Sequence, residues 1–151
     1  MVAGFRHFDP QDPRVKGFRG FVGSANTTYT LLGVTRFTFE ATRDLEYSFD
    51  PATPYYILGA GRLTMSQRIA GPFDIIATAG RDQLKYQDVE GLPVRGRIDR
   101  TRTVGGGVGF RLGPSLRLTL IYDVTDRTSS ELNRREYHRR RLFAAVTYGG
   151  A

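Results

Sequence analysis

The side chains of this sequence that could do chemistry are mostly charged, and many of them fall at every second position of long segments. Charged residues of both signs suit a water-filled surface, whereas in a dry core each would need a buried partner. On a wet surface they can pair with one another or bias the passage of ions. The residues expected to face such a surface are Arg36, Glu40, Asp44, Glu46, Arg62, Asp74, Asp82, Arg111, Arg117, Asp123 and Arg127.

Motifs for catalysis, or for binding a metal or a cofactor, do not occur in the sequence. His7 and His138 are the two histidines, there is no cysteine, and neither His-Glu-x-x-His nor Gly-x-Ser-x-Gly is found. The glycine-rich stretch 105–109 lacks the lysine and the hydroxyl residue of a phosphate-binding loop. Glycines inside a strand more often mark curvature or a bulge. We therefore expect no catalytic residue, no metal site and no cofactor.

The charged positions belong to long segments in which apolar and polar residues alternate. The clearest runs from Thr35 to Phe49, with period two throughout. At ~3.3 Å per residue it would be roughly 50 Å long, whereas an ordinary strand has ~5–6 residues. No segment has the 3.6-residue period of a helix. Further strands are expected at residues 2–8, 17–31, 55–68, 73–84, 98–112, 115–127 and 136–148.

Tight turns and longer polar loops separate these segments in strict alternation. The turns contain Gly33, Gly71 and Gly113, and the loops between them are rich in Asp, Pro and Arg. In outer-membrane barrels the short turns face the periplasm and the longer loops face outward. No apolar run approaches the ~18–20 residues of a transmembrane helix. The pattern predicts one all-β domain over residues 1–151, an antiparallel up-and-down transmembrane β-barrel of about eight strands.

The first ten residues contain no apolar segment that could serve as a signal peptide. An exported barrel requires such a segment. We expect either that the signal has been removed from this sequence, or that the chain is the C-terminal part of a larger barrel, and we favour the second explanation.

Several short stretches resemble a known family. They are Arg43–Ser48, Gly105–Phe110, Leu112–Leu118 and Tyr137–Gly149, and they are similar to the C-terminal portion of bacterial outer-membrane β-barrel porins that accompany exopolysaccharide operons. The resemblance implies a location in the bacterial outer membrane and no enzymatic activity. It also implies a role in exopolysaccharide export, or in passive passage of solutes through a charged polar lumen.

The last expected strand begins with the strongest basic cluster of a chain whose net charge is +7. On the extracellular side its side chains would meet the phosphates of lipopolysaccharide and outer-membrane lipid, or an anionic polysaccharide. A nucleic-acid partner is not expected. The cluster consists of Arg134, Arg135, Arg139, Arg140 and Arg141.

The end of the same strand is apolar at every second position. It resembles the signal by which the barrel-assembly machinery takes up its clients, an alternating apolar strand that ends in an aromatic residue. The residues concerned are Leu142, Ala144, Val146 and Tyr148.

Two other functions stay open at the level of sequence. The first is a soluble calycin-like β-barrel that binds a small apolar ligand, which requires an apolar inner face and a polar outer face. The second is a plugged structural or adhesive outer-membrane barrel without transport. The second is open because side chains roughly fill the interior of an eight-stranded barrel.

Overall fold

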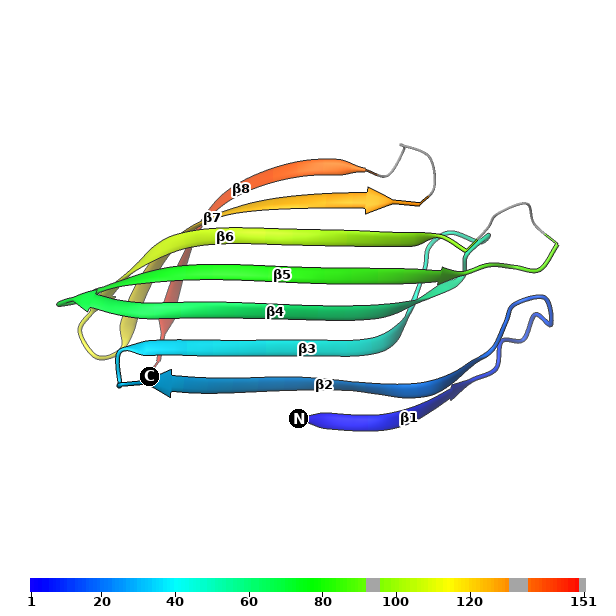
Figure 1. The fold of residues 1–151 in the computed structure, drawn as a ribbon, viewed down its shortest axis with the longest axis horizontal. Coiled ribbons are helices and arrows are strands. Elements are labelled where there is room, and N and C mark those ends of the chain that lie inside the picture. The colour runs from blue at the N-terminus through cyan, green and yellow to red at the C-terminus, as the bar shows by residue number, and fades with distance from the viewer. Residues whose placement is uncertain (92–95, 131–135, 150–151) are drawn as a thin grey trace.

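The computed structural model describes residues 1–91, 96–130 and 136–149. They form one eight-stranded antiparallel sheet in which each strand pairs with its neighbours in the sequence (Figure 1). The predicted all-β, up-and-down architecture is therefore confirmed. The strands are β1 (Val2–Phe8), β2 (Phe18–Leu31), β3 (Thr35–Tyr47), β4 (Tyr55–Ala70), β5 (Phe73–Gln87), β6 (Ile98–Leu112), β7 (Leu116–Ser129) and β8 (Tyr137–Tyr148).

The three predicted glycine turns lie together at one end of the sheet, which we call the turn end. Gly33, Gly71 and Gly113 have φ values of 68°, 55° and 69°, in the left-handed region that glycine occupies without steric cost. The longer connections lie at the opposite end, the loop end. The strand predicted to end at Phe49 ends at Tyr47, because the chain turns there and Ser48 donates a backbone hydrogen bond to Pro54 at 2.8 Å.

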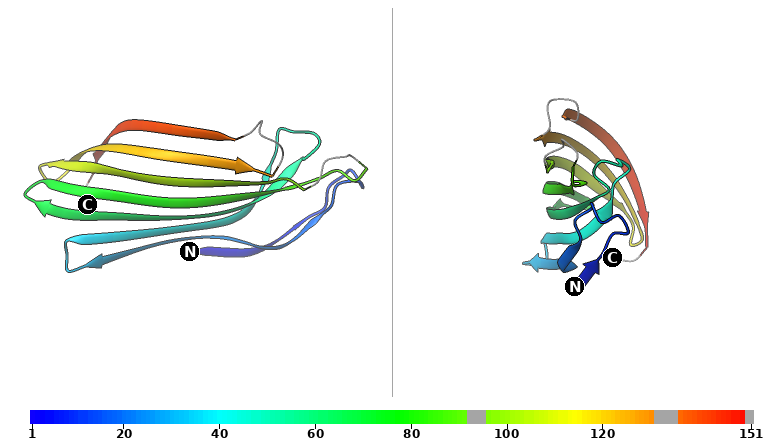
Figure 2. Two further views of the ribbon diagram at one scale, coloured as in Figure 1. Left: turned by 45° about the horizontal axis from the view of Figure 1, so that its top comes forward. Right: turned by 90° about the vertical axis from the view of Figure 1, so that its right-hand side faces the viewer.

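The sheet is strongly curved but open. Figure 2 shows β7 and β8 sweeping around from the plane of the central strands, so that the sheet has one concave face. In the described part of the chain, β1 and β8 are not paired with each other. These eight strands therefore form a curved wall with two free edges and do not close a barrel by themselves.

Ion pairs that cross an intervening strand identify the concave face. Arg6 of β1 reaches Asp44 of β3 across β2 at 2.8 Å, and Arg117 of β7 reaches Asp74 of β5 across β6. Side chains converge in this way on the concave side of a curved sheet. We call the face that carries these residues the inner face, and the opposite face the outer face.

The outer face carries a band of apolar side chains that stand open to the surroundings. Val104 is 42% exposed, Val108 54% and Leu120 46%. On β6 and β7 the outward residues of 104–112 and of 116–124 are all apolar or glycine, a run of about nine residues on each strand. That length matches the ~9–11 residues with which a tilted strand crosses the hydrocarbon layer of a membrane.

A small buried apolar cluster lies at the loop end. Phe18, Leu45 and Tyr55 are almost fully buried. The Tyr55 hydroxyl donates to the backbone carbonyl of Lys16, and Val15 forms an isolated bridge with Val89. The backbone N–H of Val89 also donates to the carbonyl of Ala52 at 3.3 Å, so the connections β1–β2, β3–β4 and β5–β6 contact one another at this end.

Within the β1–β2 connection, Arg14 hydrogen-bonds the side chain of Asp12 at 2.8 Å. This hydrogen bond holds the pKa of the Asp12 carboxyl below its ordinary value.

Across residues 1–91, 96–130 and 136–149, no helix is long and apolar enough to span a membrane.

Candidate functional site

The strand register places every predicted lumen residue on the inner face. The polar positions of β3 align with those of β4 and β5, and the same rows continue into β6 and β7. Because side chains alternate between the two faces of a sheet, these rows define one continuous charged surface. Its predicted members are Arg36, Glu40, Asp44, Glu46, Arg62, Asp74, Asp82, Arg111, Arg117, Asp123 and Arg127.

A basic cluster occupies the turn end of the inner face. Arg36, Arg68, Arg111 and Arg117 line a hollow of about 210 Å³ together with threonine and serine side chains. Arg117 is paired with Asp74, whose side chain is 1% exposed. The other three arginines have no ion pair among the described residues. We call these three residues, Arg36, Arg68 and Arg111, the turn-end arginines.

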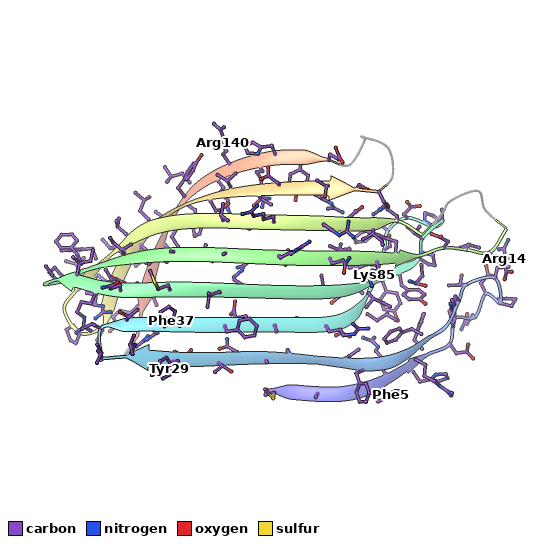
Figure 3. All side chains as sticks on the ribbon, viewed as in Figure 1. Phe5, Arg14, Tyr29, Phe37, Lys85 and Arg140 are labelled. Atoms are coloured by element: carbon purple, nitrogen blue, oxygen red, sulfur yellow. The ribbon has the colours of Figure 1, made fainter. Side chains whose placement is uncertain are left out.

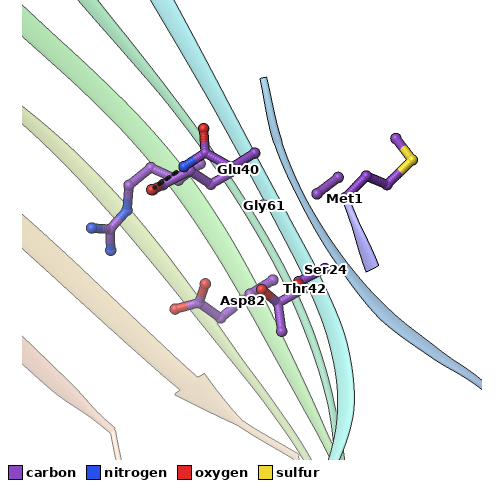
Figure 4. Close-up of a pocket in the computed structure, with 10 residues that line it drawn as sticks. Met1, Ser24, Glu40, Thr42, Gly61 and Asp82 are labelled. Atoms are coloured by element: carbon purple, nitrogen blue, oxygen red, sulfur yellow. Dashed lines mark hydrogen bonds between the residues drawn. The ribbon is translucent and has the colours of Figure 1, made fainter. Parts of the chain in front are cut away.

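The middle of the inner face carries both signs of charge. Glu40 on β3 lies directly opposite Arg62 on β4, and Asp82 on β5 lies in the adjacent row. Asn26 donates a hydrogen bond to Glu40 at 3.3 Å (Figure 4). These residues line an open hollow of about 420 Å³. The hollow is wide and polar, which suits hydrated solutes better than an apolar ligand.

A buried network lies at the loop end of the inner face. Asp99 is 0% exposed and accepts hydrogen bonds from Ser129 at 2.6 Å, from Arg127 at 2.5 Å and from Arg97 at 3.2 Å. The Arg97 guanidinium also stacks on the ring of Tyr86, 3.4 Å from its centre. This network locks the ends of β6 and β7 together.

Sequence reasoning missed Asp99, Arg97 and Arg68 as members of the inner face. Arg68 continues the alternation of Arg62 on β4, and Asp99 is in phase with the predicted Arg111 on β6, so their positions within the strands could have identified both residues. Arg97 precedes β6, and its place over Tyr86 depends on the path of the connection, which alternation does not reveal.

The described part of the basic run, at the start of β8, is divided between the two faces. Arg139 and Arg141 lie on the inner face, where Arg141 pairs with Asp123 at 2.7 Å. Adjacent strand residues point to opposite faces, which leaves Arg140 on the outer face. The predicted Arg134 and Arg135 lie outside the described residues.

The apolar alternate residues of β8 all lie on the outer face. Leu142 is 65% exposed, Val146 68% and Tyr148 84%, and Ala144 lies between them. They continue the apolar band of β7 to the edge of the sheet.

Among the residues that the structure describes, no group of three or more His, Cys, Asp or Glu side chains is placed to hold a metal ion. His138 is paired with Asp126 at 2.5 Å on the outer face, and His7 accepts a hydrogen bond from Arg19 at 3.4 Å. Both histidines lie apart from the charged inner face.

A comparison with models of known protein families agrees with this arrangement of faces. The sequence model of the family described as Putative beta-barrel porin 2 matches residues 1–149, which is nearly the whole chain. No curated protein and no solved structure matches. Membership of a porin family points to a non-enzymatic protein of the outer membrane, in agreement with an apolar outer face and a charged inner face. The chain therefore belongs to the Putative beta-barrel porin 2 family, and its open up-and-down sheet is consistent with the wall of a porin-like outer-membrane β-barrel.

Proposed function

We propose that this chain forms the wall of a passive outer-membrane pore whose inner face favours anions at the turn end. The observation that carries the proposal is the division of the sheet into an apolar outer face and a charged inner face. A soluble barrel with an apolar pocket would need the reverse arrangement. Acidic polysaccharides are a second class of solute for this pore. The turn-end arginines have no ion pair within the described chain, and the sequence resembles porins associated with exopolysaccharide operons.

A pore of this kind needs more strands than these eight. Lipid-exposed sheet edges with unpaired backbone groups do not occur within the hydrocarbon layer. The free edges of β1 and β8 must therefore pair with further strands, from the same protein or from another chain. A wider barrel also removes the difficulty that an eight-stranded barrel has an interior filled by side chains.

Assembly of such a wall would use the last strand. We propose that Leu142, Ala144, Val146 and Tyr148 form the segment that the barrel-assembly machinery recognises. Their common outer face and their position on an edge strand support this role.

The orientation of the wall in lipid is tested by two arginine substitutions. Val108→Arg places a charge in the middle of the outer apolar band, and we expect it to destabilise the inserted protein by about 2–4 kcal/mol. Thr42→Arg adds the same side chain to the inner hollow near Glu40 and Asp82, and we expect little change. The measurement is the denaturant midpoint of the full-length protein in lipid vesicles. Equal midpoints for the two variants would contradict a lipid-facing outer surface.

Ion selectivity tests the pore itself. In planar bilayers under a KCl gradient, the full-length protein is expected to conduct with a preference for chloride. Replacing the turn-end arginines with glutamine in the triple variant Arg36→Gln, Arg68→Gln, Arg111→Gln should lower the chloride-to-potassium permeability ratio about two- to fivefold, because charged rings set pore selectivity.

The matched control removes the same charge from the outer face by the changes Arg81→Gln, Arg100→Gln and Arg102→Gln. This control should leave the permeability ratio unchanged. A full-length protein that gives no conductance at any voltage would show a plugged structural or adhesive barrel and would exclude the pore.

A further inference from the structure

The outer face near the loop end is uniformly basic over the central strands. Within β3, β4, β5 and β6, every Asp and Glu faces inward, so none of these described strands carries an outward carboxylate. The outward charges of these strands are all positive. They are Arg43, Arg81, Lys85, Arg100 and Arg102, and Lys85 is labelled near the loop end in Figure 3.

Three of these arginines converge on one shallow depression. Arg81 on β5 lies directly opposite Arg102 on β6, and Arg100 is two residues along β6 on the same face. Like charges directly opposite each other in a sheet repel. All three side chains are exposed, and none of them makes an ion pair or a hydrogen bond with the described residues. The repulsion between Arg81 and Arg102 is therefore not relieved by a neighbouring carboxylate on β5 or β6.

The nearest outward carboxylate is already engaged. Asp126 on β7 also lines the depression and lies opposite Arg102 in the register, and one of its carboxylate oxygens is 2.5 Å from His138 of β8. Among the described residues, none forms an ion pair with Arg81, Arg100 or Arg102, so these guanidinium groups can bind an external anion.

The floor of the depression leaves room for a ligand. It is formed by Gly61 and Ala79, and a Cβ atom added to Gly61 would meet nothing within 4 Å. The depression has a volume of about 660 Å³. Small residues beneath three arginines allow a bulky anionic group to approach the sheet closely.

The position of the depression along the strands, relative to the apolar band, indicates which anion binds there. Val104, two residues from Arg102 on the same face of β6, begins the apolar band. A ligand held by Arg81, Arg100 and Arg102 therefore lies at the edge of the hydrocarbon layer. Because the longer loops of outer-membrane barrels face outward, this edge belongs to the outer leaflet. This assignment rests on the membrane orientation in the proposed function.

We propose that Arg81, Arg100 and Arg102 form a binding site for the phosphate groups of the outer-leaflet glycolipid, lipid A. Guanidinium groups bind phosphate through paired, charge-assisted hydrogen bonds. The acyl chains of the same lipid would lie against the apolar band below the site. Arg140 also lies on the outer face, but on β8, and it is not part of this site.

The test compares two triple variants of the full-length protein in detergent micelles. The first carries Arg81→Gln, Arg100→Gln and Arg102→Gln on the outer face, and the control carries Arg36→Gln, Arg68→Gln and Arg111→Gln on the inner face. Binding of diphosphorylated lipid A is measured by native mass spectrometry. A basic residue near an anionic membrane surface contributes about fivefold, so we expect roughly 100-fold weaker binding by the outer variant and no change in the control.

Three further ligands test whether the site recognises the phosphates of lipid A or another anion. Lipid A without phosphates should bind the wild-type protein as weakly as the outer variant binds diphosphorylated lipid A. Inorganic phosphate and a soluble acidic polysaccharide should not compete at concentrations that match the lipid. Equal binding by the outer variant and the wild type would overturn the proposal, as would equally strong binding of the phosphate-free lipid or effective competition by the polysaccharide.

Failure of this site and failure of the pore are distinguishable. A protein that conducts ions but binds lipid A equally well with and without the three arginines would contradict the lipid site alone. A protein that gives no conductance, yet loses lipid A in the outer variant only, would contradict the pore and support the site.

Discussion

Replacing Gly107 with alanine is expected to prevent β6 and β7 from pairing in their observed register. A Cβ atom at this position would overlap the backbone carbonyl oxygen of Leu120 and would lie 3.0 Å from the Cα of Ile121. Both obstacles are backbone atoms of the neighbouring strand, so a side-chain rotation cannot relieve the overlap. Overpacking of this kind costs about 1–3 kcal/mol, and more where the backbone must move.

The adjacent glycine provides a matched control. Alanine at Gly106 would place its Cβ 3.6 Å from the nearest atom, the carbonyl oxygen of Ile76, which is ordinary van der Waals contact. Both variants gain the same reduction in unfolded-state entropy, so the difference between them isolates the steric conflict.

The measurement is the amount of each full-length variant that reaches the outer membrane in a form resistant to unfolding by detergent without heat. We expect Gly107→Ala to be strongly depleted and Gly106→Ala to match the wild type. Equal assembly of the two variants would mean that β6 and β7 do not approach each other as closely as the structure shows.

Replacing Asp99 with asparagine is expected to produce the largest loss of stability among the inner-face substitutions. The carboxylate is fully buried and accepts hydrogen bonds from Arg97, Arg127 and Ser129. Asparagine keeps the shape of the side chain but removes the charge that the two arginines share. Breaking a buried ion pair by removing one partner costs about 3–5 kcal/mol.

The control for Asp99→Asn is Asp44→Asn, which removes a carboxylate from a solvent-exposed ion pair. Asp44 pairs with Arg6, and the two side chains are 41% and 37% exposed. Exposed pairs contribute about 0–1 kcal/mol. Denaturant midpoints of the full-length variants in vesicles measure the difference. A smaller shift for Asp99→Asn than for Asp44→Asn would contradict the role of the loop-end network.

Much of the fold could be predicted from the sequence because strand alternation is a local property. Arg36, Glu40 and Asp44 are spaced by even numbers of residues, and this spacing alone places them on one face of any strand. Gly33, Gly71 and Gly113 marked the turns for a similarly local reason, since a turn conformation with positive φ is accessible to glycine at no steric cost.

The same local rule divides the basic run at the start of β8. Alternation alone places Arg139 and Arg141 on the face opposite to Arg140, and the register assigns the first two to the inner face and Arg140 to the outer face.

Register and curvature were decided by the tertiary structure. The opposition of Arg81 and Arg102, and the pairs that join Arg6 to Asp44 and Arg117 to Asp74, link residues far apart in the chain. They depend on how strands slide and bend against one another, which no single strand encodes. The sequence by itself determined the strands, the turns and the two faces, because these follow from alternation and backbone sterics within each segment. The tertiary structure decided that the sheet is open, which face is concave and which charges meet, because these depend on packing between strands.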